Sequence, residues 1–226
     1  MCRVEAIVAL NTDIKEYLHK EGRDNVYFIP NGIDPEKYYN KNDENFILFG
    51  GRFHRVKGIE YLIQAYSEIC GTFNVGLRLV GGGPEEERLK RLVKSKMIEK
   101  RVKFIPFLDK KQFSECLSRC SVFVLPSLHE TFGIVLLEAM ASSKTAIVSN
   151  ISGPKDIVKH GYNGFLFEKT NVKELKKYLE FCLSSKNKCK EVGENARISV
   201  QEEYSFEMIT QAYLTLFEKI LNKRIN

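Results

Sequence analysis

The strongest constraint on the fold is a regular alternation of strand-like and helix-like segments. Six short apolar runs rich in β-branched and aromatic residues stand at 46–49, 77–80, 102–107, 122–125, 146–149 and 165–167. They are apolar on both faces, which is typical of parallel strands covered by helices on both sides. Helical patterns separate them, as in residues 58–70. This alternation predicts an α/β fold with a doubly wound, Rossmann-like parallel sheet.

Local signals place several helix starts. Pro84 follows a glycine turn and is expected to open a helix. Asp109 with Gln112, and Asn171 with Glu174, have the spacing of capping boxes. From about residue 171 onward the chain has no strand signal and reads as two or three helices. Ser205 is the expected cap of the last one.

The first thirty residues have their own pattern. A strand is expected at 4–10, a helix at 13–20 and a second strand within NVYFIP, before the Asn-Gly turn at Asn31. We therefore divide the chain into a lead-in, 1–30, a main domain, 31–204, and a C-terminal helix, 205–226.

Charge and cysteine content exclude several classes of protein. The net charge is +6, and its densest basic run, residues 90–103, suits either an anionic partner or a solvated helix face. An apolar stripe of Leu89, Leu92, Val93 and Met97, and the lack of aromatic residues, favour the solvated face. We expect no nucleic-acid partner and at most peripheral membrane contact.

The six cysteines form no C-x-x-C pair, and Cys116 and Cys120 are poorly spaced for a metal. We expect reduced thiols and no metal site. The start of the chain lacks a signal-peptide pattern, and no segment approaches the ~20 apolar residues of a membrane span. These features predict a cytoplasmic protein.

Candidate site residues follow the strands, because ligands bind at the carboxyl ends of strands in open α/β sheets. Gly51, Arg52 and Lys57 lie in a glycine-flanked loop after the first main strand. Two cations and the N–H groups of a helix start suit a diphosphate, although a solvated basic turn has the same composition. The triple glycine 81–83 indicates either close ligand approach or a tight turn, and it is not a G-x-G-x-x-G dinucleotide fingerprint.

Two glutamates follow the fourth main strand. Glu130 ends a loop, and a helix is expected to start near 131–133. Glu138 stands among apolar residues, where a carboxylate is costly unless it faces a partner or a cleft. The competing interpretation is an exposed glutamate on the edge of the helix. Asp156 is expected near the start of a further short helix, whose dipole it would complement.

Together these motifs resemble the group 1 glycosyltransferases, which are retaining enzymes of the GT-B fold. The resemblance is carried by NGID (31–34), GR-x4-KG (51–58), LVGGGP (79–84), PS-x2-E-x-FG-x4-EAMA (126–141) and G-P-x-D followed by G-x2-G (153–164). The resemblance covers most of the chain, which is similar to the C-terminal, donor-binding domain of these enzymes. It implies that 1–30 is a remnant of the N-terminal acceptor domain with its linker, and that the last helix crosses back toward that side.

The resemblance also implies roles for individual residues. Arg52 and Lys57 would neutralise the donor diphosphate in place of a metal ion, with Gly51 in the same loop. Glu130 would contact the transferred sugar, and the N–H groups of Phe132 and Gly133 would support sugar and phosphate. Glu138 would hold the ribose hydroxyls. The main chain near Leu108 would contact the base.

The implied activity is transfer of a hexosyl-type sugar from a nucleotide-diphosphate sugar to an acceptor in glycan biosynthesis, with no cofactor. The acceptor half would come from a separate protein or through self-association. Two alternatives stay open: a non-catalytic nucleotide-sugar-binding module or truncated remnant, and another doubly wound protein such as an epimerase or a phosphorylase-like domain.

Three departures from the family pattern concern loops. Ser143 stands where a glycine is usual, and Thr145 where a proline is usual, which puts the path of that turn in doubt. Pro106 replaces a glycine near the expected base site, and Asp156 replaces a glutamate.

Overall fold

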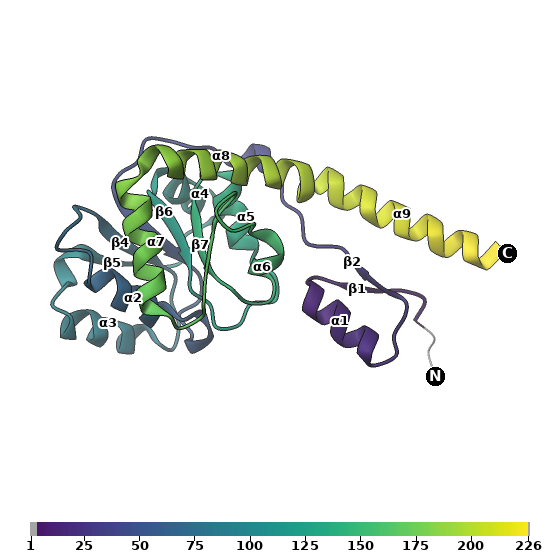
Figure 1. The fold of residues 1–226 in the computed structure, drawn as a ribbon, viewed down its shortest axis with the longest axis horizontal. Helices are drawn as coiled ribbons and strands as arrows, with labels where there is room; N and C mark the ends of the chain where they lie inside the picture. Colours follow the sequence, from purple (N-terminus) through teal and green to yellow (C-terminus); the bar gives the residue numbers. More distant parts are fainter. Residues whose placement is uncertain (1–3, 226) are drawn as a thin grey trace.

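The computed structural model describes residues 4–225 and is built around one parallel sheet (Figure 1). The strand order is β5-β4-β3-β6-β7-β8, and every neighbouring pair is parallel. This confirms the predicted doubly wound, Rossmann-like sheet. The strands are β3 (Phe46–Gly50), β4 (Gly76–Val80), β5 (Val102–Ile105), β6 (Val122–Leu125), β7 (Ala146–Ser149) and β8 (Phe165–Phe167).

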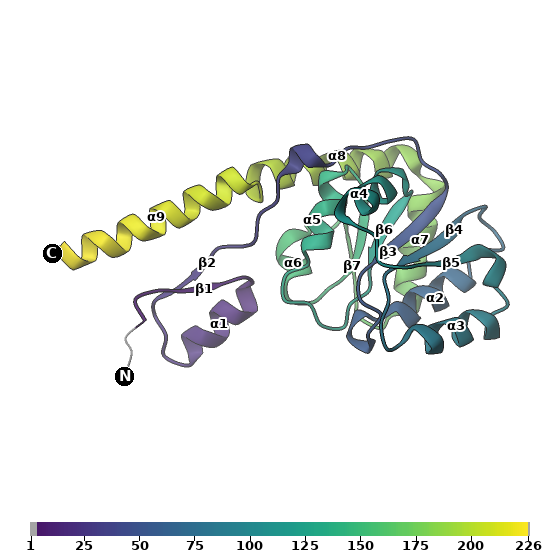
Figure 2. The same cartoon turned by 180° about the vertical axis from the view of Figure 1, so that it is seen from behind.

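Helices cover both faces of this sheet (Figures 1 and 2). On one face α2 packs against α3 and α7, and on the other α5 packs against α4 and α8. Burial on both faces explains why β3, β6 and β7 are buried at every residue. The helices are α2 (Ile59–Ser67), α3 (Glu86–Ser95), α4 (Lys110–Arg119), α5 (Ile134–Ala141), α6 (Pro154–Ile157), α7 (Val172–Ser184), α8 (Lys186–Glu203) and α9 (Phe206–Ile225).

Short 3-10 turns complete the main domain. These are η1 (Pro35–Lys37), η2 (Arg55–Lys57) and η3 (Glu99–Arg101). The strand order runs outward from the centre in both directions, because β4 and β5 lie on one side of β3, and β6 to β8 lie on the other. The reversal leaves a crevice between the carboxyl ends of β3 and β6, where open sheets of this kind bind ligands.

The first residues form a separate small unit. Strands β1 (Ile7–Ala9) and β2 (Val26–Phe28) pair in parallel, and α1 (Thr12–Lys20) connects them. The unit is fixed to the main domain by polar contacts: the Asn11 amide donates to the carbonyl of Thr131 (2.7 Å), and both the N–H and the hydroxyl of Thr12 donate to Asp156 (2.9 and 2.6 Å). The Asp156 carboxylate therefore binds the first residue of α1, in addition to lying near the start of its own four-residue helix α6.

Helix α9 leaves the main domain and extends beside the N-terminal unit (Figures 1 and 2). It starts where predicted, since the Ser205 hydroxyl accepts from the N–H of Met208 (3.3 Å). Its Lys219 ammonium lies 5.1 Å from the centre of the Tyr27 ring on β2. The domain boundaries at residues 30 and 205 stay predictions.

Several local expectations need correction. The strand expected at 102–107 ends at Ile105, because Pro106 has no N–H for the ladder. Pro84 stands two residues before α3, whose N-cap is Glu85. Asn171 caps α7, but Glu174 accepts from the N–H of Glu168 (2.8 Å) instead of closing a full capping box. The box at Asp109 and Gln112 is confirmed.

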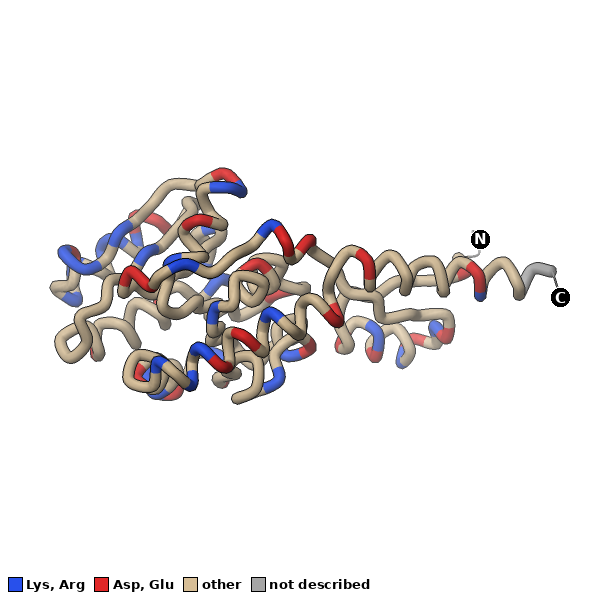
Figure 3. Tube along the Cα trace, turned by 90° about the horizontal axis from the view of Figure 1, so that it is seen from above, with Lys and Arg blue, Asp and Glu red and all other residues tan. Residues whose placement is uncertain are grey.

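The basic run at 90–103 is a solvated helix face. On α3, Leu89 and Val93 are buried, and Lys90 pairs with Glu86 (2.8 Å) and Glu87 (3.1 Å). Met97 does not belong to the apolar stripe, because it lies beyond the helix end and is 87% exposed. Figure 3 shows both signs of charge interspersed over the described chain.

The described cysteines, Cys70, Cys116, Cys120, Cys182 and Cys189, are free thiols, whereas Cys2 lies outside the described residues. No helix within residues 4–225 is both long enough and apolar enough to cross a bilayer.

Candidate functional site

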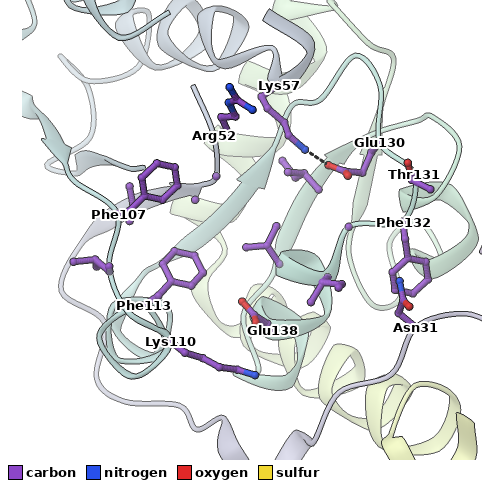
Figure 4. A pocket seen from close by; sticks show the side chains of 18 of the residues that line it. Asn31, Arg52, Lys57, Phe107, Lys110, Phe113, Glu130, Thr131, Phe132 and Glu138 are labelled. Carbon is purple, nitrogen blue, oxygen red and sulfur yellow. Dashed lines mark hydrogen bonds and ion pairs between the residues drawn. The ribbon is translucent and has the colours of Figure 1, made fainter. Parts of the chain in front are cut away.

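A cavity of about 660 Å³ opens at the crevice between β3 and β6 (Figure 4). Its volume lies within the ~300–1,000 Å³ typical of small-molecule sites. All eight residues singled out in the sequence line it: Gly51, Arg52, Lys57, Leu108, Glu130, Phe132, Gly133 and Glu138. The fold therefore brings together residues that are up to 87 positions apart, although their roles stay predictions.

The triple glycine supports this cavity from behind. A Cβ at Gly81 would overlap the Gly51 carbonyl oxygen, and one at Gly83 would overlap the Phe53 carbonyl. The backbones are also bonded, since Gly51 N–H donates to Val80 (2.9 Å) and Phe53 N–H to the carbonyl of Gly82 (2.8 Å). Of the two interpretations, the tight turn is correct: these glycines hold the Arg52 loop in place and do not themselves line the cavity.

Arg52 and Lys57 have different surroundings. Arg52 is exposed, and among the described residues it makes no ion pair. Lys57 is mostly buried, and its ammonium lies 2.6 Å from a carboxylate oxygen of Glu130 (Figure 4). An ammonium has three N–H donors, so Lys57 keeps donors for a further partner after bonding Glu130.

Close backbone packing fixes this pair. Gly58 is left-handed (φ 61°), and a Cβ there would overlap the Pro126 carbonyl. The N–H of Leu128 donates to the Val56 carbonyl (2.7 Å). The two loops after β3 and β6 are thus joined, which sets the Lys57–Glu130 distance.

The start of α5 faces the cavity. Gly133 precedes it in a left-handed conformation (φ 98°) and provides no side-chain cap. The first N–H groups of the helix are therefore left without intrahelical partners beside Phe132 and Gly133. A helix start of this kind favours an anionic or hydroxyl-bearing ligand.

Glu138 lies one turn into α5 and points into the cavity (Figure 4). Its carboxylate accepts a hydrogen bond from the hydroxyl of Tyr38 (2.9 Å). Burial raises the pKa of Glu138, while the Tyr38 hydrogen bond and the positive charge of Lys110 act in the opposite direction. The interpretation as a solvent-facing surface glutamate is therefore wrong.

Sequence reasoning missed part of the cavity wall. Phe107, which is 67% exposed, and Phe113 form an apolar wall next to Leu108 (Figure 4). Tyr38 orients Glu138, and Lys110 places a cation nearby. The capping box at Asp109 was a usable signal for Lys110 and Phe113, because it placed the start of α4 directly after a strand end. Tyr38 is distant in sequence and had no such signal.

The chemistry available here is positioning and charge stabilisation. The cavity is lined by the cations Arg52, Lys57 and Lys110, by the start of α5 and by two partly buried carboxylates, Glu130 and Glu138. Within residues 4–225, no group of three His, Cys, Asp or Glu side chains is arranged to hold a metal ion.

The comparisons with known proteins agree with this geometry. The sequence pattern of the family described as glycosyl transferases group 1 matches residues 30–199. This chain belongs to that family. Its parallel sheet with helices on both faces is a GT-B glycosyltransferase domain, as solved relatives have it.

Three known proteins are similar to this chain along nearly its whole length. An uncharacterized glycosyltransferase of Methanocaldococcus jannaschii is 32% identical over 96% of this chain and 60% of its own length. Sucrose-phosphate synthase from Thermosynechococcus elongatus has a TM-score of 0.89 at 26% identity, over 98% of this chain and 59% of that chain. An Anabaena protein solved with UDP and glucose has a TM-score of 0.85 at 22% identity, over 95% and 63%.

The chain spans about three fifths of the length of such relatives. The activity of a whole glycosyltransferase is accordingly a proposal for this chain and is argued next.

Proposed function

We propose that this group 1 glycosyltransferase chain binds a nucleotide-diphosphate sugar and forms the donor-binding part of a retaining transferase. One observation carries the proposal: Arg52, Lys57 and Glu138 converge on a single cavity at the point where the strand order reverses. Cations, helix-start N–H groups and a carboxylate match the diphosphate and ribose of such a donor. The Anabaena protein, which has been solved with UDP and with UDP-glucose, supports this ligand class.

The diphosphate would lie against Arg52 and Lys57. Arg52 is uncommitted among the described residues, and its planar guanidinium suits bidentate contact with phosphate oxygens. Lys57 would donate to the diphosphate while Glu130 holds it in place (2.6 Å). As the bond to the sugar breaks, these cations stabilise the charge that develops on the leaving diphosphate, without a metal ion.

The nucleoside would lie toward Glu138. An ionised carboxylate accepts hydrogen bonds from two ribose hydroxyls, and Tyr38 fixes its orientation (2.9 Å). Main chain at Leu108 and the apolar wall of Phe107 and Phe113 would meet the base. The Glu130 side chain and the N–H groups at Phe132 and Gly133 would contact a hexosyl-type sugar.

Titration calorimetry tests the donor site. We would titrate the chain with UDP, GDP and ADP and their sugar conjugates, and repeat the titration with Arg52→Ala and Glu138→Ala. Each variant should lose about tenfold or more in affinity for one nucleotide, since a charge-assisted contact contributes ~1.5–3 kcal/mol.

The chain offers a control of the same residue type for each variant. Arg55→Ala removes an exposed arginine of the same loop that pairs with Glu85 (3.5 Å), and Glu87→Ala removes an exposed glutamate of α3. Both should bind as wild type. Equal losses in the controls, or no nucleotide binding by the wild-type chain, would refute the donor site.

The alternative is a non-catalytic nucleotide-sugar-binding module. It predicts the same binding but neither transfer nor donor hydrolysis, with or without an added acceptor-domain protein. Assays of sugar release separate the two.

A further inference from the structure

A second cavity, of about 470 Å³, lies at the opposite edge of the sheet. It is formed by the segment before β3, the start of β6, the turn between α5 and β7, and the junction of α7 and α8. Because the six strands are parallel, their amino ends gather at this edge, away from the donor cavity at their carboxyl ends. Its walls share no residue with the donor cavity.

Lys144, in the turn between α5 and β7, is a buried lysine on the wall of this cavity. It is only 5% exposed, yet its ammonium forms no hydrogen bond or ion pair within the described chain. Burial lowers the pKa of Lys144, and Asp43 and Cys120 oppose that shift only through space. A buried cation without a bonded partner is costly, and here it lines a cavity large enough for an anion.

The first turn of α8 supplies further donors. Ser185 precedes this eighteen-residue helix and forms no side-chain cap, so the first N–H groups keep no intrahelical partner. Lys186 and Lys190 stand one turn apart on the cavity wall. Lys186 makes no ion pair among the described residues, and Lys190 reaches Glu194 only at 3.8 Å.

The acidic group at this cavity is already engaged. Asp43 accepts from the N–H of Asn45 (2.7 Å) and from the hydroxyl of Ser121 (2.6 Å). Lys41 is likewise committed, to Glu115 at 2.9 Å. Within the described chain Lys144 and Lys186 are therefore unpaired and Lys190 has only a long ion pair to Glu194, while the carboxylate of Asp43 is already occupied.

We propose that this cavity is a second anion site that binds the phosphate group of free phosphate or of a small phosphate monoester. Several ammonium donors and a helix start converge there, which suits the several oxygens of a phosphate better than the two of a carboxylate. The volume leaves room for the organic part of a monoester. Bound phosphate would bridge the β7 turn and α8, which already meet where Thr145 donates to the Cys189 carbonyl (2.5 Å).

Titration calorimetry at constant ionic strength, with inorganic phosphate and with glycerol phosphate as probes, tests the site. Lys186→Met and Lys144→Met should each weaken binding by about tenfold or more, as loss of a charge-assisted contact does. Lys188→Met is the matched control, because Lys188 pairs with Glu191 (2.7 Å) and does not line the cavity. Arg52→Ala distinguishes the two cavities, because Arg52 lines only the donor cavity. Phosphate binding at the second cavity should be unchanged in this variant.

Lys186 is exposed, so its variant should fold normally and can decide the question even if Lys144→Met unfolds. Tighter binding of glycerol phosphate indicates a monoester site, and equal binding indicates a site for the phosphate group itself. The proposal is overturned if the wild-type chain binds neither probe, or if Arg52→Ala abolishes binding while Lys186→Met leaves it intact.

Discussion

At the scale of single residues, Glu138 combines a charge with an apolar helix. Leu137 and Ala139 on either side are fully buried, yet the Glu138 side chain reaches the cavity and the Tyr38 hydroxyl. Burial raises its pKa above the ordinary value of 4.5. The ionised form that would accept ribose hydroxyls is therefore lost at a higher pH than for an exposed glutamate.

This shift predicts the pH dependence of nucleotide binding. Affinity should fall as pH decreases through a range above 4.5, because Glu138 becomes protonated there. Glu138→Gln should bind more weakly at neutral pH and lose this dependence, which calorimetry from pH 7.5 to 5 would measure. An unchanged pH profile in Glu138→Gln would assign the titration to another group.

The raised pKa of Glu138 also makes the stability of the folded chain depend on pH. The folded chain holds the Glu138 proton more tightly than the unfolded chain, so the contribution of this group to stability falls as pH rises through that range. Glu138→Gln should therefore show a smaller loss of stability than wild type between pH 4.5 and neutrality, as measured by denaturant unfolding. A loss as large as that of wild type would argue against this pKa shift.

Gly81 offers a second prediction at this scale. Its φ of 141° is unfavourable for other residues, and an added Cβ would overlap the Gly51 carbonyl. Gly81→Ala should cost about 2 kcal/mol or more in stability and weaken nucleotide binding by displacing the Arg52 loop. Denaturant unfolding and calorimetry would measure the two effects. Gly71→Ala, where a Cβ meets nothing within 4 Å, should be close to neutral.

At the scale of elements, the N-terminal unit and the loop before α5 depend on each other. Asn11 is 2% exposed, caps α1 by accepting from Ile14 (2.8 Å) and donates to the Thr131 carbonyl (2.7 Å). Thr131 follows Glu130 directly and precedes Phe132. A single side chain thus couples α1 to the segment that carries the expected sugar contacts.

Asn11→Ala should loosen both elements. Loss of a cap and a buried hydrogen bond costs about 1–2 kcal/mol, so hydrogen exchange should accelerate in α1 and in the 130–133 loop. Asn25→Ala removes an exposed bond to Val4 (2.8 Å) in the same unit and should leave the loop unchanged. Unaltered exchange at 130–133 in Asn11→Ala would contradict the coupling.

At the scale of the whole molecule, α9 exposes an apolar face. Leu214, Phe217 and Leu221, at helical spacing, are 49%, 54% and 56% exposed. Contiguous apolar surface of this kind favours association. The helix projects away from the main domain and extends beside the N-terminal unit (Figure 1).

We therefore predict that the chain self-associates as its concentration rises. Phe217→Lys should shift sedimentation velocity profiles toward monomer without lowering the unfolding temperature by more than a few degrees, because Phe217 makes little core contact. Glu218→Ala, at an exposed position of the same helix, is the control. A wild-type chain that stays monomeric at high concentration would refute the prediction.

Local sequence patterns predicted most of the strands and helices of this fold. Strands buried on both faces carry continuous apolar runs, so all six strands of the main sheet were predicted from their composition. Capping residues at Asp109 and Ser205 act through neighbours within three residues, so their helix starts were predicted too. The loop motifs and the family resemblance that they carry also predicted eight residues that line the cavity.

What local sequence could not supply are contacts between distant segments. Tyr38 meets Glu138, and Asn11 meets Thr131, each across at least 100 residues. The path of the turn at Ser143 was also open, because a glycine is usual there. In the structure Ser143 itself adopts the left-handed conformation (φ 53°). The sequence determined which segments are strands and helices, because periodicity and capping are local. The tertiary structure decided which loops meet, because that depends on strand order and on close backbone approach at a few glycines.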